Sequence, residues 1–326
     1  MAIQDRFGRK IDYVRVSVTD RCDLRCSYCL PKSYKDFTTP EHWLSYNEIT
    51  RVVKAFTELG TSRIRLTGGE PLVRPEISTL ARQLTALPLL KDLSLSTNAT
   101  RLGKQANELR EAGIARINVS LDTLDAATYK SITRGKIEKT LKGLDAAKKA
   151  GFDYIKINCV VMKGVNDHQL LDMVEYCKQN NFTLRFIETM PMGSAGLEVS
   201  KTQYLSLQTV RKQLEKEFEL IPDVMPGGGP ARYVRIAGTD CRIGFITPIS
   251  QHFCETCNRV RLSAEGTLYM CLGQEHSVDL RTPLRAGIND DELKELILKA
   301  IELKPEKHEF KEKPEQVVRF MSMTGG

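Results

Sequence analysis

Three cysteines near the N-terminus are spaced so that a single loop can wrap them around one metal centre. Cys22, Cys26 and Cys29 are separated by three and two residues, and they follow a short apolar segment. A structural zinc site takes four ligands, whereas a [4Fe–4S] cluster held by three thiolates leaves one iron open. The spacing therefore predicts an iron–sulfur cluster with an open iron. The alternative is a zinc knuckle whose fourth ligand comes from elsewhere, for example from His42.

A second group of three cysteines lies in the C-terminal part of the chain. Cys254 and Cys257 are separated by two residues, and thirteen residues separate Cys257 from Cys271. Because three thiolates again leave one iron open, this group predicts a second [4Fe–4S] cluster. A zinc ribbon is the alternative, with Cys241, His252 or His276 as the fourth ligand.

Two arginines lie shortly after the second cysteine pair. Arg259 and Arg261 flank Val260, and in an extended segment such alternate residues share one face. The guanidinium fork matches phosphate oxygens with two parallel hydrogen bonds. We therefore expect a phosphate-bearing ligand beside the second cluster. The alternative is a pair of solvated arginines.

Short β-branched segments alternate with longer segments of helical apolar spacing as far as residue 188. This pattern is typical of repeated βα units with a parallel sheet, and glycines past the helix ends support it. Six units are too few to close an eight-stranded barrel, so we expect an α/β fold, a partial, laterally open (β/α)6 TIM-like barrel. The expected strands are residues 13–19, 63–67, 92–96, 116–121, 154–161 and 184–188. The expected helices between them are residues 47–59, 76–87, 102–111, 137–150 and 169–180.

The regular alternation stops at about residue 190. We expect residues 1–190 to form the barrel domain with the first cluster. Residues 191–326 are expected to form a C-terminal α+β domain that covers the open side, contains the second cluster and ends in a Gly-Gly tail. The expected elements of this part are helices at 207–218 and 290–303 and strands at 233–236 and 242–247.

The composition is that of an ordinary globular protein, with 41% hydrophobic and 27% charged residues in a chain of 326. No stretch approaches the roughly 20 apolar residues of a spanning helix, so we expect a soluble, cytoplasmic protein without membrane contact. Its nine cysteines then favour metal binding over disulfides, because the cytosol keeps thiols reduced. The net charge of +7 suits an anionic ligand, while no basic run with interleaved aromatic residues indicates nucleic acid.

The first triplet, together with Gly68-Gly69-Glu70-Pro71 after the second predicted strand, resembles the radical S-adenosylmethionine superfamily. The resemblance implies that the open iron binds S-adenosylmethionine and that a radical made from this cofactor abstracts a hydrogen atom. The cofactor contacts that it implies are Tyr28, Gly69, Glu70, Ser120 and Met190. Outside this context Ser120 reads as an ordinary strand hydroxyl and Met190 as a core residue.

Within that superfamily, both triplets, the Arg259-Val260-Arg261 segment and the C-terminal Gly-Gly resemble the GTP-cyclising enzymes of molybdenum cofactor biosynthesis. This resemblance implies two clusters, the second at the guanine ring, and conversion of GTP to (8S)-3',8-cyclo-7,8-dihydroguanosine 5'-triphosphate. The GTP contacts that it implies are Arg15, Arg65, Ser96, Lys156, Arg185, Arg259, Val260 and Arg261. The catalytic residues that it implies are Arg15, Gly325 and Gly326. Ser96 and Ala99 depart from the commonest family pattern, but Ser96 keeps a hydroxyl group.

The strand cations also support an anionic substrate on physical grounds. A cation inside a barrel is costly unless it is paired or faces a polar cavity, and strand alternation places Arg15, Arg65, Lys156 and Arg185 inside. The alternative is that they pair with carboxylates such as Glu70, Asp122 or Glu188.

The resemblance further implies a flavodoxin- or ferredoxin-like electron donor, a downstream cyclic pyranopterin monophosphate synthase and a homodimer. Two other functions stay open. One is a radical S-adenosylmethionine enzyme that modifies a peptide with the help of an auxiliary cluster. The other is a zinc-stabilised nucleotide-binding protein, which would be colourless.

Overall fold

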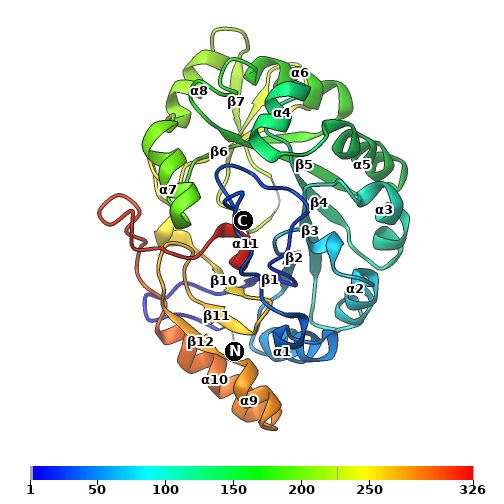
Figure 1. The fold of residues 1–326 in the computed structure, drawn as a ribbon, viewed down its shortest axis with the longest axis vertical. Helices are drawn as coiled ribbons and strands as arrows, with labels where there is room; N and C mark the ends of the chain where they lie inside the picture. The colour runs from blue at the N-terminus through cyan, green and yellow to red at the C-terminus, as the bar shows by residue number, and fades with distance from the viewer. Residues whose placement is uncertain (1–2, 226, 326) are drawn as a thin grey trace.

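The chain folds around one continuous sheet of twelve strands (Figure 1). The computed structural model describes residues 3–225 and 227–325. In spatial order the strands are β12, β11, β10, β1, β2, β3, β4, β5, β6, β9, β8 and β7. Strands β1 to β6 run parallel, each beside the next, as the sequence predicts. Their bounds are β1 Tyr13–Ser17, β2 Arg63–Thr67, β3 Asp92–Thr97, β4 Arg116–Ser120, β5 Tyr154–Val161 and β6 Thr183–Glu188.

Helices cover the outer side of the arc that these strands form (Figure 1). Val14 and Val16 of β1 are fully buried in the main apolar core, whereas Arg15 between them lines a cavity. The two faces of the strand therefore differ as strand alternation requires. The α-helices of the described chain, inside and outside the arc, are α1 Tyr46–Glu58, α2 Ile77–Thr85, α3 Leu102–Glu111, α4 Ala126–Thr133, α5 Ile137–Lys149, α6 Leu170–Asn180, α7 Gly193–Thr202, α8 Leu207–Leu214, α9 Arg281–Arg285, α10 Asp290–Glu302 and α11 Met321–Thr324.

Local sequence signals fix several helix ends. Helix α1 begins at a capping box in which Ser45 and Glu48 each bond to the other's backbone N–H. The predicted glycines past helix ends all have positive φ angles, 97° at Gly60, 93° at Gly113 and 71° at Gly151. Helix α4 was missed, although Asp125 caps its first turn. Helix α7 was missed as well.

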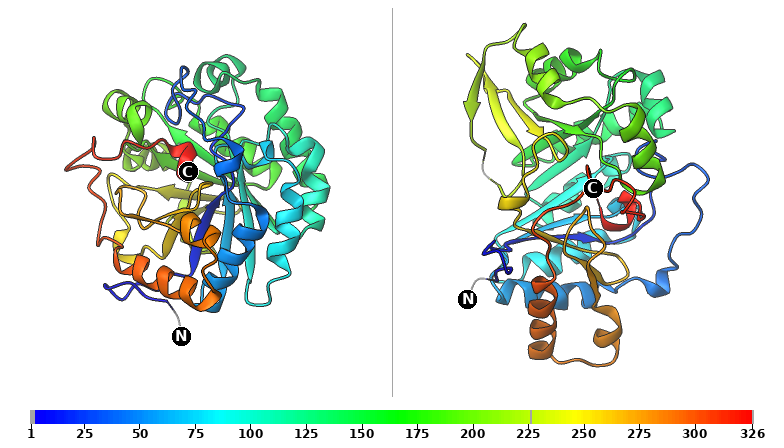
Figure 2. Two further views of the ribbon diagram at one scale, coloured as in Figure 1. Left: turned by 60° about the horizontal axis from the view of Figure 1, so that its bottom comes forward. Right: turned by 90° about the vertical axis from the view of Figure 1, so that its left-hand side faces the viewer.

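The C-terminal half extends the barrel sheet at both edges. Strand β10 pairs in parallel with β1, and β9 pairs in parallel with β6. In the described residues the outermost strands β12 and β7 are not neighbours, so the sheet stays open, as predicted. Figure 2 shows the three antiparallel strands β7, β8 and β9 at one end of this arc. The added strands are β7 Leu220–Asp223, β8 Arg232–Ile236, β9 Arg242–Ile246, β10 Arg259–Leu262, β11 Thr267–Tyr269 and β12 Ser277–Asp279.

The predicted boundary between residues 190 and 191 stays a prediction. The sheet and the main apolar core continue across it, since Leu184 of β6 and Ile243 of β9 belong to the same core. Short helix α11 lies inside the arc against β1 (Figure 1). Within the described ranges, no helix has the length and apolarity that a bilayer crossing needs.

A glycine on α5 allows close packing against the loop that follows β3. A Cβ atom on Gly143 would lie 2.1 Å from the Ala99 carbonyl oxygen. We therefore expect Gly143→Ala to destabilise the fold by about 1–3 kcal/mol through overpacking. Gly103→Ala, on the facing helix α3, is the control, because its Cβ would lie 3.9 Å from the nearest described atom. Denaturant unfolding measures both, and equal stability of the two variants would contradict this packing.

Candidate active site

A cavity of about 1020 Å³ lies at the C-terminal ends of the barrel strands. It contains all the residues predicted for the first cluster and its cofactor, which come from the loop after β1 and from the ends of β2, β4 and β6. The predicted residues that line it are Cys22, Cys26, Tyr28, Cys29, Gly69, Glu70, Ser96, Ser120 and Met190. The strand ends thus bring together side chains from across the first 190 residues.

The Gly68-Gly69 turn after β2 packs directly on the loop that carries the first triplet. Cβ atoms at these glycines would lie 2.4 Å from the Thr19 carbonyl oxygen and 2.3 Å from the Arg21 carbonyl oxygen. The Glu70 N–H donates to the Arg21 carbonyl oxygen at 2.8 Å. The turn therefore needs glycine for close backbone approach, and it fixes Glu70 beside the cysteine loop.

Two buried carboxylates line this cavity. Glu70 accepts hydrogen bonds from the Thr97 hydroxyl at 2.7 Å and from the Asn98 N–H at 2.6 Å. Asp122 accepts from the Tyr28 hydroxyl at 2.8 Å. Burial raises the pKa of Glu70 to about 7 and that of Asp122 to about 6. A cationic group of a ligand would offset this desolvation.

The first triplet is held by its own loop and by α4. The backbone N–H groups of Arg25 and Ser27 donate to carbonyl oxygens at the end of α4, each at 2.9 Å. Burial raises the pKa of Cys29 to about 12 and raises those of Cys22 and Cys26 as well. The charge of Arg25 lowers the pKa of Cys29 but does not offset this desolvation, so these thiols need a metal centre nearby to ionise.

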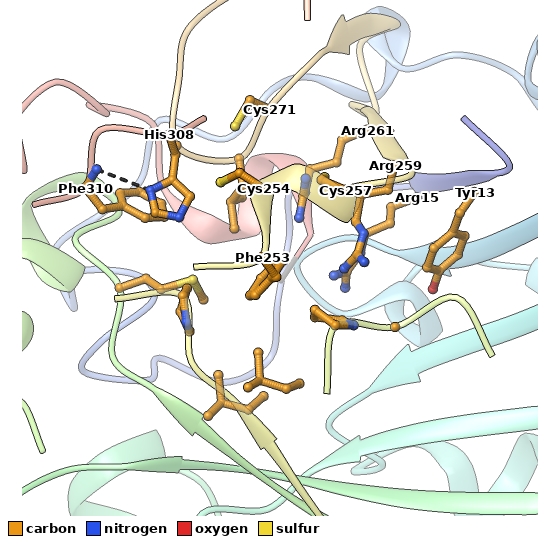
Figure 3. Close-up of a pocket in the computed structure, with 18 of the residues that line it drawn as sticks. Tyr13, Arg15, Phe253, Cys254, Cys257, Arg259, Arg261, Cys271, His308 and Phe310 are labelled. Atoms are coloured by element: carbon orange, nitrogen blue, oxygen red, sulfur yellow. Dashed lines mark hydrogen bonds between the residues drawn. The ribbon is translucent and has the colours of Figure 1, made fainter. Parts of the chain in front are cut away.

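A second cavity, of about 940 Å³, lies between the second triplet and the barrel interior (Figure 3). The predicted residues that line it are Arg15, Arg65, Arg185, Met190, Cys254, Cys257, Arg259, Arg261 and Cys271. Asn158, Ile187 and Met190 line both cavities. The two cavities are therefore adjacent, and ligands in them can lie in contact.

Parallel pairing sets the cations of the second cavity in a row. In the sheet register Arg15 of β1 lies between Arg261 of β10 and Arg65 of β2. Arg185 reaches the cavity from β6. Lys156 of β5 lines a smaller neighbouring cavity with Arg65 and Arg185. Strand β10 from the C-terminal half thus completes a cationic surface that the barrel begins.

The carboxylates proposed as alternative partners of these cations are engaged elsewhere. Glu70 and Asp122 bond to hydroxyl and backbone groups beside the first triplet. Glu188 accepts from the backbone N–H groups of Ile249 and Ser250. Within the part of the chain that the structure describes, none of the predicted cations forms an ion pair, a set that comprises Arg15, Arg65, Lys156, Arg185, Arg259 and Arg261.

Desolvation and mutual repulsion act on these cations together. Burial, followed by repulsion from Arg261 and Arg65, lowers the pKa of Arg15. Burial and the neighbouring Arg185 lower the pKa of Lys156 to about 7. The Nε atoms of Arg15, Arg185 and Arg261 are buried without a hydrogen-bond partner among the described residues. Unsatisfied buried donors of one charge sign fit a polyanionic ligand.

Each cysteine of the second triplet is contacted by a buried cation from another segment. Arg9 donates to the Cys254 carbonyl oxygen, Lys304 lies at the Cys257 sulfur, and Arg319 donates to the Cys271 carbonyl oxygen. Burial opposes ionisation of Cys257, but the charges of Lys304 and Arg259 lower its thiol pKa to about 7.

The alternative zinc sites have weaker support in this geometry. Cys241 is buried and lies close to Cys177 of α6, in the main apolar core, while His252 and His276 are exposed.

Three further predicted residues lie at the strand ends or in the core. Ser96 lines the first cavity and not the second. The Val260 side chain is fully buried in the main core, so only its backbone is near the second cavity. A Cβ on Gly325 would lie 2.2 Å from the Thr67 methyl carbon, which places the tail at the end of β2. Gly326 lies outside the described residues.

Sequence reasoning missed several residues that line the cavities. Asn158 lies two positions after Lys156 on β5, and Tyr13 lies two positions before Arg15 on β1. Strand alternation could have indicated both, because residues two positions apart on a strand share one face. His308 and Phe253, which line the second cavity near the triplet, lie in irregular segments that gave no such signal (Figure 3).

The unpaired cations predict binding of inorganic tripolyphosphate by the protein alone. At about 100 times its dissociation constant, this anion should raise the melting temperature by about 5 °C. Arg15→Met should raise the melting temperature of the ligand-free protein, because it removes a charge that its neighbours repel. The same variant should weaken tripolyphosphate binding about tenfold, through loss of a charge-assisted hydrogen bond.

Arg211→Met is the matched control for this thermal shift experiment. Arg211 lies on α8 and pairs with Glu215 at 2.8 Å, with its side chain 46% exposed. Neither the ligand-free stability nor the anion effect should change in this variant. An undiminished tripolyphosphate shift in Arg15→Met would count against the anion site.

Comparison with known proteins gives matches along nearly the whole chain. A family model described as Radical SAM superfamily matches residues 16–177, and one described as Molybdenum Cofactor Synthesis C matches residues 182–310. The structure of Streptococcus suis SuiB bound to S-adenosylmethionine is similar, with a TM-score of 0.61 and 14% identity. That match covers 83% of this chain and 63% of SuiB, and it shows the fold alone.

Curated relatives match over full length and share one name, "GTP 3',8-cyclase". The relative from Marinobacter nauticus is 46% identical, with 99% of this chain and 98% of that protein covered. The relative from Pseudomonas fluorescens has the same identity and the same coverage. The relative from Hydrogenovibrio crunogenus is 46% identical over 100% of both chains. The chain therefore belongs to the GTP 3',8-cyclase family of the radical S-adenosylmethionine superfamily.

Proposed function

We propose that this chain cyclises GTP to (8S)-3',8-cyclo-7,8-dihydroguanosine 5'-triphosphate in molybdenum cofactor biosynthesis. The name of its full-length relatives states a GTP cyclase activity. The observation that carries the proposal is the row of cations without carboxylate partners, in a cavity that adjoins the first triplet. A nucleoside triphosphate supplies the phosphate oxygens that these guanidinium groups need.

Membership of the radical S-adenosylmethionine superfamily implies one [4Fe–4S] cluster and S-adenosylmethionine. Cys22, Cys26 and Cys29 are the residues that would hold this cluster. When bound, the pair supplies a carbon radical that removes a hydrogen atom from the substrate. The buried Glu70 carboxylate suits the amino end of the methionine moiety, while Tyr28 orients Asp122 through its hydroxyl.

The remaining predicted contacts to this cofactor come from strand ends and from the glycine turn. Ser120 ends β4 and offers a hydroxyl group to the ribose. Met190, which lines both cavities, offers a thioether and backbone groups to the adenine. Gly69 lets the turn approach the cysteine loop closely, and its backbone faces the first cavity, where the methionine end would lie.

Cys254, Cys257 and Cys271 are proposed to hold a second [4Fe–4S] cluster, with the guanine ring against its open iron. The triphosphate would then lie along the cations of β10, β1 and β2, with Arg185 and Lys156 beyond them. Ser96 would reach the substrate from the first cavity. This placement puts the ribose between the two cavities, where hydrogen abstraction has to occur.

Arg15, Gly325 and Gly326 are proposed as the catalytic residues. Arg15 is central in the cation row, so its charge acts on the substrate with the least screening. The tail approaches Thr67, at the mouth of the first cavity, where a side chain on Gly325 would not fit. The flavodoxin- or ferredoxin-like donor, the downstream synthase, the homodimer and the cytoplasmic location remain predictions.

The peptide-modifying alternative is less well supported. The likeness to SuiB concerns the fold, at 14% identity. A peptide substrate gives no reason for a dense row of unpaired cations, whereas a triphosphate does. The zinc-stabilised binding protein would not need two adjacent cavities.

The decisive experiment follows a hydrogen atom from substrate to cofactor. Reconstituted protein is incubated without oxygen with S-adenosylmethionine, dithionite and GTP deuterated at C3'. Mass spectrometry then reads the 5'-deoxyadenosine formed. We expect deuterium in 5'-deoxyadenosine and a cyclised nucleotide product. Deoxyadenosine formed without deuterium, and independently of GTP, would refute GTP as the substrate.

The two cysteine triplets should fail in different ways when single cysteines are replaced. Cys26→Ser should abolish 5'-deoxyadenosine formation, because the first cluster cannot assemble. Cys257→Ser should abolish cyclisation but spare slow cleavage of S-adenosylmethionine without GTP. Cys177→Ser, in the apolar core, is the control for loss of a buried thiol. Equal loss of cleavage in Cys26→Ser and Cys257→Ser would contradict this division of roles.

A further inference from the structure

A buried lysine contacts the second cysteine triplet. Lys304 follows α10 and is only 1% exposed. Its Nζ donates to the carbonyl oxygens of Arg259 at 3.0 Å and Met270 at 2.8 Å. The same atom lies 3.6 Å from the Cys257 sulfur. One ammonium group thus connects β10, the segment after β11 and a thiol of the triplet.

Lys304 differs from the two other cations that contact this triplet. Arg9 has its own carboxylate, Asp5, at 2.6 Å. Arg319 likewise pairs with Glu275 at 2.5 Å. For Lys304, no carboxylate in the described residues lies within ion-pair distance of Nζ. Its partners are two carbonyl dipoles and one sulfur atom.

A buried ammonium group without a counter-charge destabilises the fold, because it has lost its hydration. Carbonyl oxygens satisfy its N–H donors but do not balance its charge. The nearest group that can do so is the cysteine triplet, because three thiolates make a bound cluster net negative. That negative charge grows when the cluster accepts one electron, so a nearby fixed cation favours the reduced form.

The surroundings of the first triplet differ, because they combine buried carboxylates with one cation, Arg25, which donates to the Cys22 carbonyl oxygen at 2.7 Å. The buried carboxylates Glu70 and Asp122 line its cavity. They repel the first thiols, and no buried lysine touches these sulfurs within the described ranges. The two triplets thus have different electrostatic environments, with a buried ammonium group at a sulfur atom of the second and buried carboxylates beside the first.

We propose that Lys304 is a positioning residue of the second triplet, where its ammonium group fixes the Cys257 sulfur and supplies the counter-charge that makes the bound cluster easier to reduce. This inference rests on the proposed second cluster. Lys304 touches neither cavity, so it acts through the cluster and its thiolates and not through the substrate.

The test measures a reduction potential in full-length protein. A background with Cys22→Ser, Cys26→Ser and Cys29→Ser leaves the second triplet as the only predicted cluster site. Lys304→Met is added to remove the charge at similar length, and Lys304→Gln to remove the charge but keep an N–H donor. Lys299→Met is the control, because this lysine of α10 has a side chain that is 78% exposed.

Each protein is reconstituted without oxygen, its iron content is measured, and dithionite titration is followed by electron paramagnetic resonance. The background should hold about four irons per chain. Both Lys304 variants should titrate at more negative potential, with at least a tenfold lower ratio of reduced to oxidised cluster at a fixed potential, about 59 mV for one electron. Lys299→Met should match the background.

The outcomes separate this inference from the proposal on which it rests. A background that binds no iron overturns the second cluster and the role of Lys304 together. A background with about four irons, whose potential is the same with Lys304→Gln, overturns the role of Lys304 alone. If Lys304→Met does not fold, Lys304→Gln decides the question by the same measurement.

Discussion

Positive charge without a carboxylate counterpart, buried inside the barrel, is the constraint on which the rest of the structure depends. The cations of β10, β1 and β2 repel one another, as the lowered pKa of Arg15 indicates. The fold tolerates this repulsion because the outer face of the same strands is an extensive apolar core. The apolar core on one face of the sheet stabilises the fold, and the repulsion among cations on the other face reduces that stability, as is common at binding sites.

The strand register determines where these charged side chains lie relative to one another. Because β10 and β2 flank β1 in parallel, side chains at equivalent positions stand side by side at the spacing of neighbouring strands. The glycine turn after β2 then fixes the first triplet at the end of the same strands. Rigid strands, and not flexible loops, therefore set the separation of the two cavities.

Much of this arrangement could be predicted from the sequence, since six barrel strands follow from periodicity and both triplets from spacing. Inward-facing Arg15 followed from strand alternation. The place of β10 could not be predicted, because it depends on pairing with β1 across almost the whole chain. Lys304 gave no signal either, since a lysine after an amphipathic helix reads as solvent-exposed. The contacts that bury it are long-range and leave no local pattern.

The pairing of β10 with β1 also constrains the order in which the chain can fold. Tyr13 and Arg259 are register partners, so the first strand of the barrel has an unpaired edge until residues near 260 have been synthesised. An exposed strand edge of this kind is a template for aggregation, and contacts of high sequence separation form slowly. The free edge of β1 is therefore open to such pairing until β10 arrives.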